Sequence, residues 1–87
     1  MNIYPYNILN KLNVPISQYR EIGLISAINS LELIERDIII RRYKMSQSRS
    51  DIAKRHELSE FEVYKIEQTA IKKLCHPSRL RIIYIQR

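Results

Sequence analysis

The side chains that could do chemistry in this chain are mostly basic, and they are concentrated in its second half. Residues 41–87 hold twelve basic and five acidic side chains, whereas residues 1–40 hold three basic and four acidic ones. The stretch from Lys72 to Arg87 contains no acidic residue. A basic surplus of this kind attracts polyanions, and nucleic acid is the first of these to consider. The alternative is a solvated basic face that has no specific partner.

Residues suited to nucleophilic or metal chemistry are few and poorly spaced. His56 and His76 lie twenty positions apart, and Cys75 is the only cysteine. Zinc sites need three or four spaced ligands, and the neighbouring side chains of Cys75 and His76 would point apart on a helix. No glycine-rich phosphate loop, H-E-x-x-H pattern or nucleophile elbow is present. We therefore expect no enzyme activity, no metal and no cofactor.

Length and composition indicate one small helical domain. The chain has 87 residues, with a single glycine, Gly23, and three prolines. Such a composition suits helices better than a sheet with many tight turns. One cysteine allows no disulfide within the chain, and we find neither a signal peptide nor an apolar run of membrane-spanning length. We expect a cytoplasmic protein that makes no membrane contact.

The predicted fold is all-α, a small bundle of about four to five helices that contains a helix-turn-helix and follows an N-terminal arm. Residues 1–17 are interpreted as this arm, extended or with a short turn of helix, because Pro5 and Pro15 disfavour helix just before them. Residues 18–87 form the helix-turn-helix domain. The expected helices are 18–29 capped by Ser17, 31–43, a short helix capped by Ser48 that ends near residue 57, 59–74, and 77–84.

The strongest local signals surround the helix predicted from residue 59 to 74. Ser59 and Glu62 match the S-x-x-E capping box, and Leu58 and Val63 stand at the two positions of a hydrophobic staple. Apolar residues follow at helical spacing and predict one buried face, made of Val63, Ile66, Ala70, Ile71 and Leu74. The opposite face holds Glu60, Phe61, Tyr64, Lys65, Gln68 and Lys72.

The helix predicted at 31–43 has more apolar positions than one buried stripe needs. Leu33, Ile34 and Ile40 are among them. Some of these side chains must therefore face a second surface, which is either the N-terminal arm or another molecule.

Residues 30–79 resemble region 4 of bacterial primary-type sigma factors, the domain that recognises the promoter minus-35 element. Ser30 to Tyr43 is similar to the family pattern S-L-x-x-x-E-R-E-x-L…R-Y/F, and Asp51 to Ser59 is similar to its E-[IV]-[GA]…[VL]-[ST] helix and turn. Ile66 to Arg79 is similar to the ending I-E-x-x-A-L-x-K-L-R-H-P-S-R. The last four residues, His76-Pro77-Ser78-Arg79, are the most specific part of the match.

The resemblance implies a helical domain that binds the flap of RNA polymerase and the major groove of promoter DNA. Another sigma-factor subunit or a regulator is a further partner that it implies. The chain is too short to hold the other regions of a primary-type sigma factor. It therefore resembles a stand-alone region 4, an accessory factor or one part of a split factor.

The chain differs from the family pattern where the second helix of the motif begins. The family usually has R-E-R-[IV]-R-Q after the capping Ser or Thr, whereas residues 60–65 read E-F-E-V-Y-K. Arginine reads guanine and pairs with phosphate, but glutamate repels phosphate. Among these six positions Lys65 keeps a donor toward DNA. Glu57 replaces the usual glycine of the turn.

The candidate residues fall into two sets. For protein contact we select the apolar side chains of the first two helices of the domain, Ile25, Ile28, Leu33, Ile34 and Ile40. For DNA contact, direct or through phosphate, we select Arg49, Lys54, Arg55, Ser59, Glu60, Phe61, Tyr64, Lys65, Gln68, Lys72, Lys73 and Arg79, with Arg81 as a further phosphate contact.

Three functions remain open from the sequence. The first is a sigma factor-like transcription factor that binds the polymerase flap and promoter DNA. The second is a co-activator or decoy that binds polymerase or a sigma factor without specific DNA contact. The third, an ordinary dimeric helix-turn-helix repressor, is disfavoured by the His76-Pro77-Ser78-Arg79 ending.

Overall fold

The structure, a computed structural model, describes residues 3–85, and this part of the chain is helical and contains no strand. The predicted all-α class is therefore confirmed, and the helix that the prediction did not count lies in the N-terminal arm. A 3₁₀ turn, Ile16–Gln18, precedes the second helix, and a π-helical segment, Ile40–Lys44, extends the third. The α-helices are α1 (Tyr6–Leu12), α2 (Glu21–Asn29), α3 (Leu33–Ile39), α4 (Arg49–His56), α5 (Glu60–Leu74) and α6 (Pro77–Ile83).

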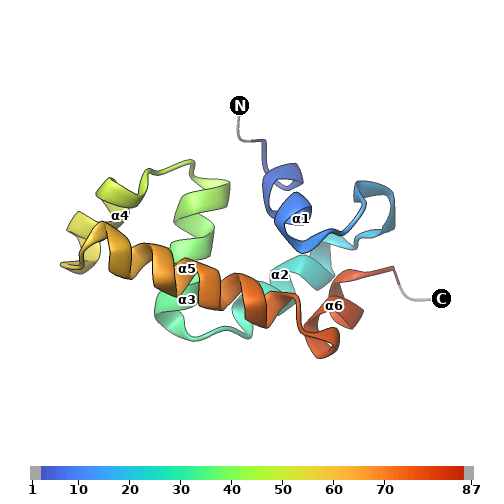
Figure 1. The fold of residues 1–87 in the computed structure, drawn as a ribbon. Coiled ribbons are helices and arrows are strands. Elements are labelled where there is room, and N and C mark those ends of the chain that lie inside the picture. The colour runs from blue at the N-terminus through green and yellow to red at the C-terminus, as the bar shows by residue number, and fades with distance from the viewer. Residues whose placement is uncertain (1–2, 86–87) are drawn as a thin grey trace.

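The longest helix, α5, runs along most of the molecule, and the other helices pack around it (Figure 1). The molecule is elongated, with principal extents of 43 × 26 × 17 Å. One end of α5 contacts α4 and α3, and its other end leads into α6, which packs against α2. This arrangement leaves one face of α5 open to solvent along its first turns.

Two apolar clusters form the core, and α5 contributes to both. The smaller cluster joins Val63 of α5 to Ile38 and Ile52 of α3 and α4. The larger cluster includes Leu74 of α5. It brings together side chains of the N-terminal arm, α2, α3, α5 and α6, among them Ile8, Leu9, Leu12, Leu24, Ala27, Ile39, Ala70, Leu74 and Ile83.

The caps predicted for α4 and α5 are confirmed. The Ser48 side chain accepts a hydrogen bond from the backbone N–H of Asp51 at 3.1 Å. The Ser59 hydroxyl accepts one from the Glu62 N–H, while the Glu62 carboxylate accepts one from the Ser59 N–H, both at 3.0 Å. These bonds satisfy backbone donors that a helix start leaves without intrahelical partners. They also lower the pKa of the Glu62 carboxyl.

The turn between α4 and α5 uses a left-handed residue other than glycine. Glu57 has φ 56° and ψ 42° and closes the C-terminus of α4. Its backbone N–H and that of Leu58 bond to the carbonyl oxygens of Lys54 and Ala53. The turn is therefore formed by Glu57 itself, at the steric cost that a side chain has in this conformation.

The start of α2 differs from the prediction. Ser17 does not cap this helix, which begins at Glu21 after the extended residue Arg20. The Arg20 N–H bonds to the carbonyl oxygen of Ile83 at 2.7 Å, and the Ile85 N–H bonds to that of Gln18 at 2.8 Å. This pairing with the chain beyond α6 holds Gln18 to Arg20 out of the helix.

The N-terminal arm contains a helix, which settles the interpretation that the sequence left open. α1 contributes Ile8, Leu9 and Leu12 to the larger cluster, where each is at most 3 % exposed. The Asn7 side chain also donates to the carbonyl oxygen of Tyr43 at 2.8 Å. The arm is therefore packed on the helices that follow it. No helix in residues 3–85 has both the length and the apolar character needed to cross a bilayer.

Candidate protein-binding groove and nucleic-acid face

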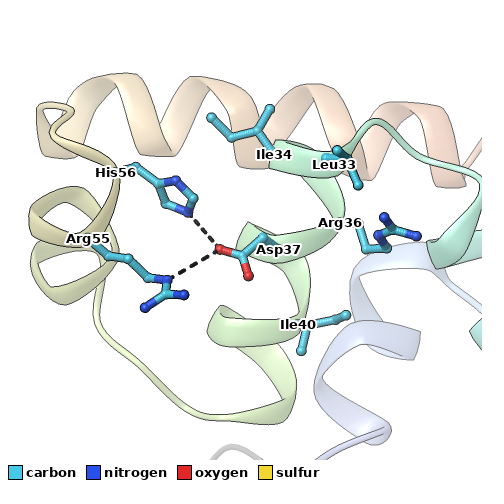
Figure 2. A pocket seen from close by; sticks show the side chains of 7 residues that line it. All are labelled: Leu33, Ile34, Arg36, Asp37, Ile40, Arg55 and His56. Carbon is cyan, nitrogen blue, oxygen red and sulfur yellow. Dashed lines mark hydrogen bonds and ion pairs between the residues drawn. The ribbon is translucent and has the colours of Figure 1, made fainter.

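A groove lies between α3 and α4 (Figure 2). Its volume is about 470 Å³. α3 lines one side with apolar and charged side chains, and the last turn of α4 forms the other side. The residues around it are Leu33, Ile34, Arg36, Asp37, Ile40, Arg55 and His56.

The groove brings together three of the five residues selected for protein contact. Leu33 is 74 % exposed, the highest exposure among the large apolar side chains of residues 3–85. Ile34 and Ile40 are half-buried and border the smaller and the larger cluster respectively. The excess apolar side chains of this helix therefore do not all pack against the arm. They leave an apolar strip that faces solvent.

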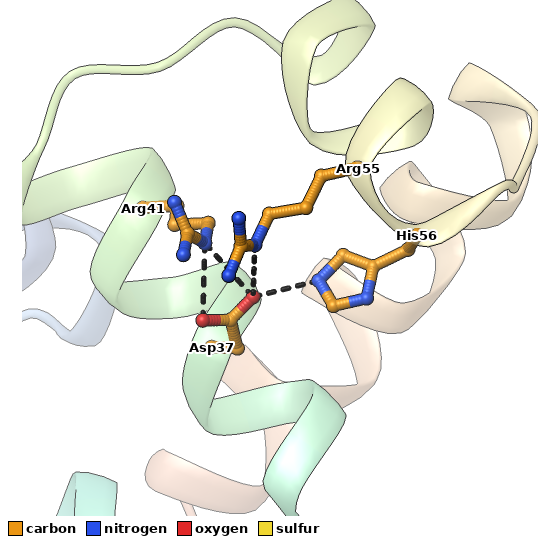
Figure 3. Close-up of polar contacts among 4 residues, drawn as sticks. All are labelled: Asp37, Arg41, Arg55 and His56. Atoms are coloured by element: carbon orange, nitrogen blue, oxygen red, sulfur yellow. Dashed lines mark hydrogen bonds and ion pairs between the residues drawn. The ribbon is translucent and has the colours of Figure 1, made fainter.

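A cluster of charged side chains centred on Asp37 joins the two sides of the groove (Figure 3). The His56 Nε2 lies 2.6 Å from the Asp37 Oδ2, and the Arg41 Nε donates to both carboxylate oxygens at 3.0 Å. Arg55 approaches from α4 with its Nε at 4.0 Å. These contacts tie the end of α4 to the middle of α3 and so fix the width of the groove.

The electrostatic balance of this cluster is positive. Burial raises the pKa of the Asp37 carboxyl, but the hydrogen bonds from His56 and Arg41 outweigh burial, so that the pKa lies below its ordinary value of 3.8. The carboxylate is therefore ionised at neutral pH, but it faces the two guanidinium groups of Arg41 and Arg55. With Arg36 on the opposite edge, an apolar strip is bordered mainly by cations (Figure 2).

The other two residues selected for protein contact lie on α2, outside this groove. Ile25 is 45 % exposed and borders a smaller hollow of about 210 Å³ that also reaches Ile40. Ile28 is only 4 % exposed and belongs to the larger cluster. Ile28 also lines this hollow, but its helix turns most of the side chain toward the core, so little of it is open to a partner.

The exposed face predicted for α5 is present. Glu60, Phe61, Tyr64 and Lys65 are exposed, and Phe61 is 67 % exposed. Further along the helix Gln68 is half-buried and Lys72 is exposed, while Ser59 is exposed but serves as the cap. Two acidic and two aromatic side chains therefore dominate the first turns of the face.

Cations lie against both aromatic rings of this face. The Lys65 Nζ is 5.6 Å from the centroid of the Phe61 ring. The Arg49 guanidinium carbon is 5.1 Å from the centroid of the Tyr64 ring. Distances of this order allow cation–π attraction. The rings and cations therefore form one mixed surface that spans α4 and α5.

A buried acid in α5, Glu67, was not identified from the sequence as a structural centre. It is 1 % exposed and accepts hydrogen bonds from the Tyr43 hydroxyl at 2.9 Å and from the Arg49 Nε at 3.0 Å. The Arg42 Nε lies 3.5 Å from the same carboxylate. The signal that could have found it is spacing, since residue 67 falls on the apolar face between Val63 and Ala70.

Some of the cations selected for DNA contact are held in place by groups of the protein. Arg49 binds Glu67, and the Lys73 Nζ lies 2.7 Å from the carboxylate of the buried Glu35. The Arg79 Nε donates to the Ser30 hydroxyl at 2.9 Å. Lys54, Lys65 and Lys72 remain exposed, and so does Arg55, although its Nε lies 4.0 Å from the Asp37 carboxylate. The structure thus separates cations with a structural task from cations that project into solvent.

Residues 76–79, which carry the most specific part of the sequence match, also have structural roles. The His76 Nδ1 accepts a hydrogen bond from the Ser78 N–H at 3.2 Å and so caps α6. Pro77 is the first residue of that helix, where its missing N–H costs nothing.

Comparisons with protein-family models, with curated proteins and with solved structures found no match to this chain. Its function therefore has to be argued from the groove and from the face of α5.

Proposed function

We propose that the chain is a sigma region 4-like transcription factor that binds the flap of RNA polymerase and, through α4 and α5, promoter DNA. Another sigma-factor subunit or a regulator is a further partner under this proposal, and the site of action is the cytoplasm. No catalytic step is involved. The groove between α3 and α4 is assigned to the polymerase, and the face of α5 with its flanking cations is assigned to DNA.

The observation that best supports this proposal is the exposed apolar strip in the groove. Leu33 is almost fully open to solvent, although a leucine at the start of a helix could pack inward. Ile34 of α3 and Ile40, the first residue of the π-helical segment, continue the strip. An apolar strip beside a hollow of about 470 Å³ suits the apolar face of a short helix from a partner.

The cations around the strip favour a partner segment with acidic flanks. Arg36 and Arg55 border the groove on opposite sides, and Asp37 is already engaged by Arg41 and His56. Acidic side chains on a docked helix would meet these guanidinium groups while its apolar residues cover Leu33. Such complementarity raises association rates and selects the orientation of the partner.

The part of the proposal that concerns DNA relies on exposed cations near α5. Lys54, Lys65 and Lys72 are exposed, and each can meet a backbone phosphate. Each phosphate contact should add about −0.9 to the slope of log affinity against log salt concentration. Base contacts have less support, because Glu60 and Glu62 stand at the start of α5 and repel phosphate.

The second candidate is a polymerase- or sigma-binding co-activator or decoy that makes no specific DNA contact. The observation that favours it is the shortage of guanidinium groups that could contact DNA at the face of α5. Arg49 binds Glu67, and the first turn of α5 has two glutamates. Both candidates use the same groove, so they differ only in what α5 contacts.

An electrophoretic mobility-shift experiment with promoter DNA separates these functions. It is run with and without RNA polymerase, at two salt concentrations. Binding to a specific promoter that requires polymerase would support the proposal. Association with polymerase that does not depend on promoter sequence would support the co-activator or decoy. Sequence-specific binding by the free protein would contradict both and indicate a repressor.

A matched pair of variants tests the groove itself. Leu33→Glu places a charge in the strip, and we expect it to weaken polymerase binding by about tenfold or more, as for the loss of a central apolar contact. Ile22→Glu changes a side chain of similar exposure, 72 % against 74 %, on α2 outside the groove. It should leave the affinity unchanged. Equal affinities for both variants would contradict the assignment of the groove.

A further inference from the structure

A second hollow, lined by polar side chains, lies where α1, the π-helical segment, α4 and α5 meet. Its volume is about 320 Å³, near the lower end of the roughly 300–1,000 Å³ that small-molecule sites occupy. It is separate from the groove between α3 and α4, and the two share no lining residue. The residues around it are Asn7, Asn10, Lys11, Arg42, Tyr43, Arg49 and Glu67.

The cations of this hollow outnumber its acids. Arg42, Arg49 and Lys11 face a single carboxylate, that of Glu67. Glu67 already accepts hydrogen bonds from Tyr43 and Arg49, so its charge is shared among several donors. One carboxylate cannot balance three cations, and the site keeps a surplus of positive charge.

Two of the three cations, Lys11 and Arg42, have side-chain N–H groups without a hydrogen-bond acceptor in the part of the chain that the structure describes. Lys11 has no hydrogen-bond or ion-pair partner among residues 3–85. The Arg42 Nη1 donates to the carbonyl oxygen of Gln47 at 3.3 Å, whereas its buried Nε has no hydrogen-bond partner in the described chain and only a 3.5 Å ion pair with Glu67. Holding a guanidinium group partly buried with incomplete pairing is unfavourable, and an anion in the hollow would offset that cost.

The positions of these groups are set by the fold. Arg49 and Arg42 form ion pairs with Glu67, and the Asn7 side chain bonds to the carbonyl oxygen of Tyr43 and to the N–H of Ile8. Asn10 and Lys11 occupy the last turn of α1 at the opening. Donors held in this way lose little conformational freedom when a ligand binds.

We propose that this hollow binds a phosphate group. A phosphate offers several acceptor oxygens and one or two negative charges to the Arg42 guanidinium, the Lys11 ammonium and the Asn10 amide, which matches the surplus of positive charge in the hollow. The phosphate comes from a free phosphate compound, which carries up to two negative charges, or from a nucleic-acid backbone, which carries one per phosphate, and both present the oxygen acceptors that these donors bind. A site for a free phosphate compound does not depend on the function proposed above, whereas a site for backbone phosphate rests on the DNA contact proposed for α4 and α5, to which Arg49 belongs.

The test is a titration of ¹⁵N-labelled protein with inorganic phosphate, with the ionic strength held constant by sodium chloride. The arginine Nε–H signals of Arg42 and Arg49 and the side-chain amide of Asn10 should move saturably. Lys11→Gln should weaken this binding, and Lys11→Glu should weaken it further, by about tenfold. Lys44→Glu, at an exposed cation that neither lines the hollow nor belongs to the residues selected for DNA contact, is the matched control and should bind as the wild type does.

A second titration with a short DNA duplex identifies the source of the phosphate. Saturable shifts of the same signals with inorganic phosphate support a site for a free phosphate compound. Shifts with the duplex alone, lost in the Lys11 variants, support a site for backbone phosphate. Signals that stay in place in both titrations, or that respond equally to sodium chloride, would overturn the proposal. So would Lys11 variants that bind as tightly as Lys44→Glu.

Discussion

Two buried carboxylates, Glu35 and Glu67, organise the polar interactions between the helices. Glu67 joins α5 to the π-helical segment and to α4 through Tyr43 and Arg49. Glu35 joins α3 to α5 through Lys73. Because a buried charge without its partner is strongly unfavourable, these pairs restrict how the helices can be placed. Burial raises the pKa of the Tyr43 hydroxyl, and the neighbouring carboxylate of Glu67 raises it further.

The importance of Glu67 can be measured with a nearly isosteric substitution. Glu67→Gln removes the charge that Arg42 and Arg49 share, while it keeps the size of the side chain. We expect the free energy of unfolding to fall by about 3 kcal/mol, as when one partner of a buried ion pair is removed. Urea denaturation followed by circular dichroism measures this change.

The matched control makes the same chemical change at the surface of the same helix. Glu60→Gln replaces an exposed glutamate in the first turn of α5, where its interaction with the helix dipole is worth at most about 1 kcal/mol. If the two variants lost the same stability, Glu67 would have no special structural role.

Asp37 should make stability depend on pH in the acidic range. Its folded-state pKa is below the ordinary value of 3.8, so its contribution is complete above that value and is lost as the pH falls through the folded-state pKa. Because Asp37 is partly exposed, the contribution is at most about 1 kcal/mol. Urea midpoints measured from neutral to acidic pH should converge for wild type and Asp37→Asn. A constant gap between the two curves would contradict this role.

At the scale of elements, the turn from α4 to α5 combines good caps with one unfavourable residue. Ser48 and Ser59 satisfy the first backbone donors of the two helices. Glu57, between them, has a positive φ that costs an ordinary residue about 1 kcal/mol or more. The geometry of the turn is kept, even though the sequence lacks the glycine that this position favours.

Replacing Glu57 by glycine should therefore stabilise the protein. We expect Glu57→Gly to raise the free energy of unfolding by up to about 1 kcal/mol, because glycine adopts this conformation without steric cost. Thermal denaturation measures the change. Lys54→Gly is the control, since it places glycine in an exposed helical position of α4 and should lower stability by about 1 kcal/mol. A loss of stability in both variants would show that Glu57 makes a favourable contact of its own.

At the scale of the whole molecule, α2 and α6 approach closely at Gly23. A Cβ atom at this position would overlap the carbonyl oxygen of Ile82. The same carbonyl accepts a hydrogen bond from the Arg20 Nε at 3.2 Å. The only glycine of the chain is therefore placed where the two helices, far apart in the sequence, come nearest.

Gly23→Ala should destabilise the protein, although alanine favours helix by about 1 kcal/mol. Overlap with Ile82 should lower the free energy of unfolding by about 1–3 kcal/mol, as other overpacked sites do. Hydrogen exchange of the Arg20 and Ile85 amides, which pair with Ile83 and Gln18, should become faster. Ser26→Ala, at an exposed position of α2, is the control and should change neither property. Unchanged exchange in Gly23→Ala would contradict the close contact.

The sequence by itself determined the features that depend on residues a few positions apart. The caps at Ser48 and Ser59, the ends of α5 and the start of α6 at Pro77 were predicted correctly, because capping bonds join residues two or three apart. The buried face of α5, with Val63 and Leu74, followed from helical spacing alone. The sequence also indicated that the apolar side chains of α3 exceed what one core can cover, as exposed Leu33 confirms.

Tertiary structure decided the features that depend on distant residues. Arg20 pairs with Ile83 across more than sixty positions, and this contact, not the cap signal at Ser17, sets the start of α2. Arg49 was selected as a free cation, but Glu67 of another helix binds it. Which basic side chains remain free for a partner depends on where acids from other helices lie, and local spacing does not contain that information. The groove and the polar hollow both arise from such packing.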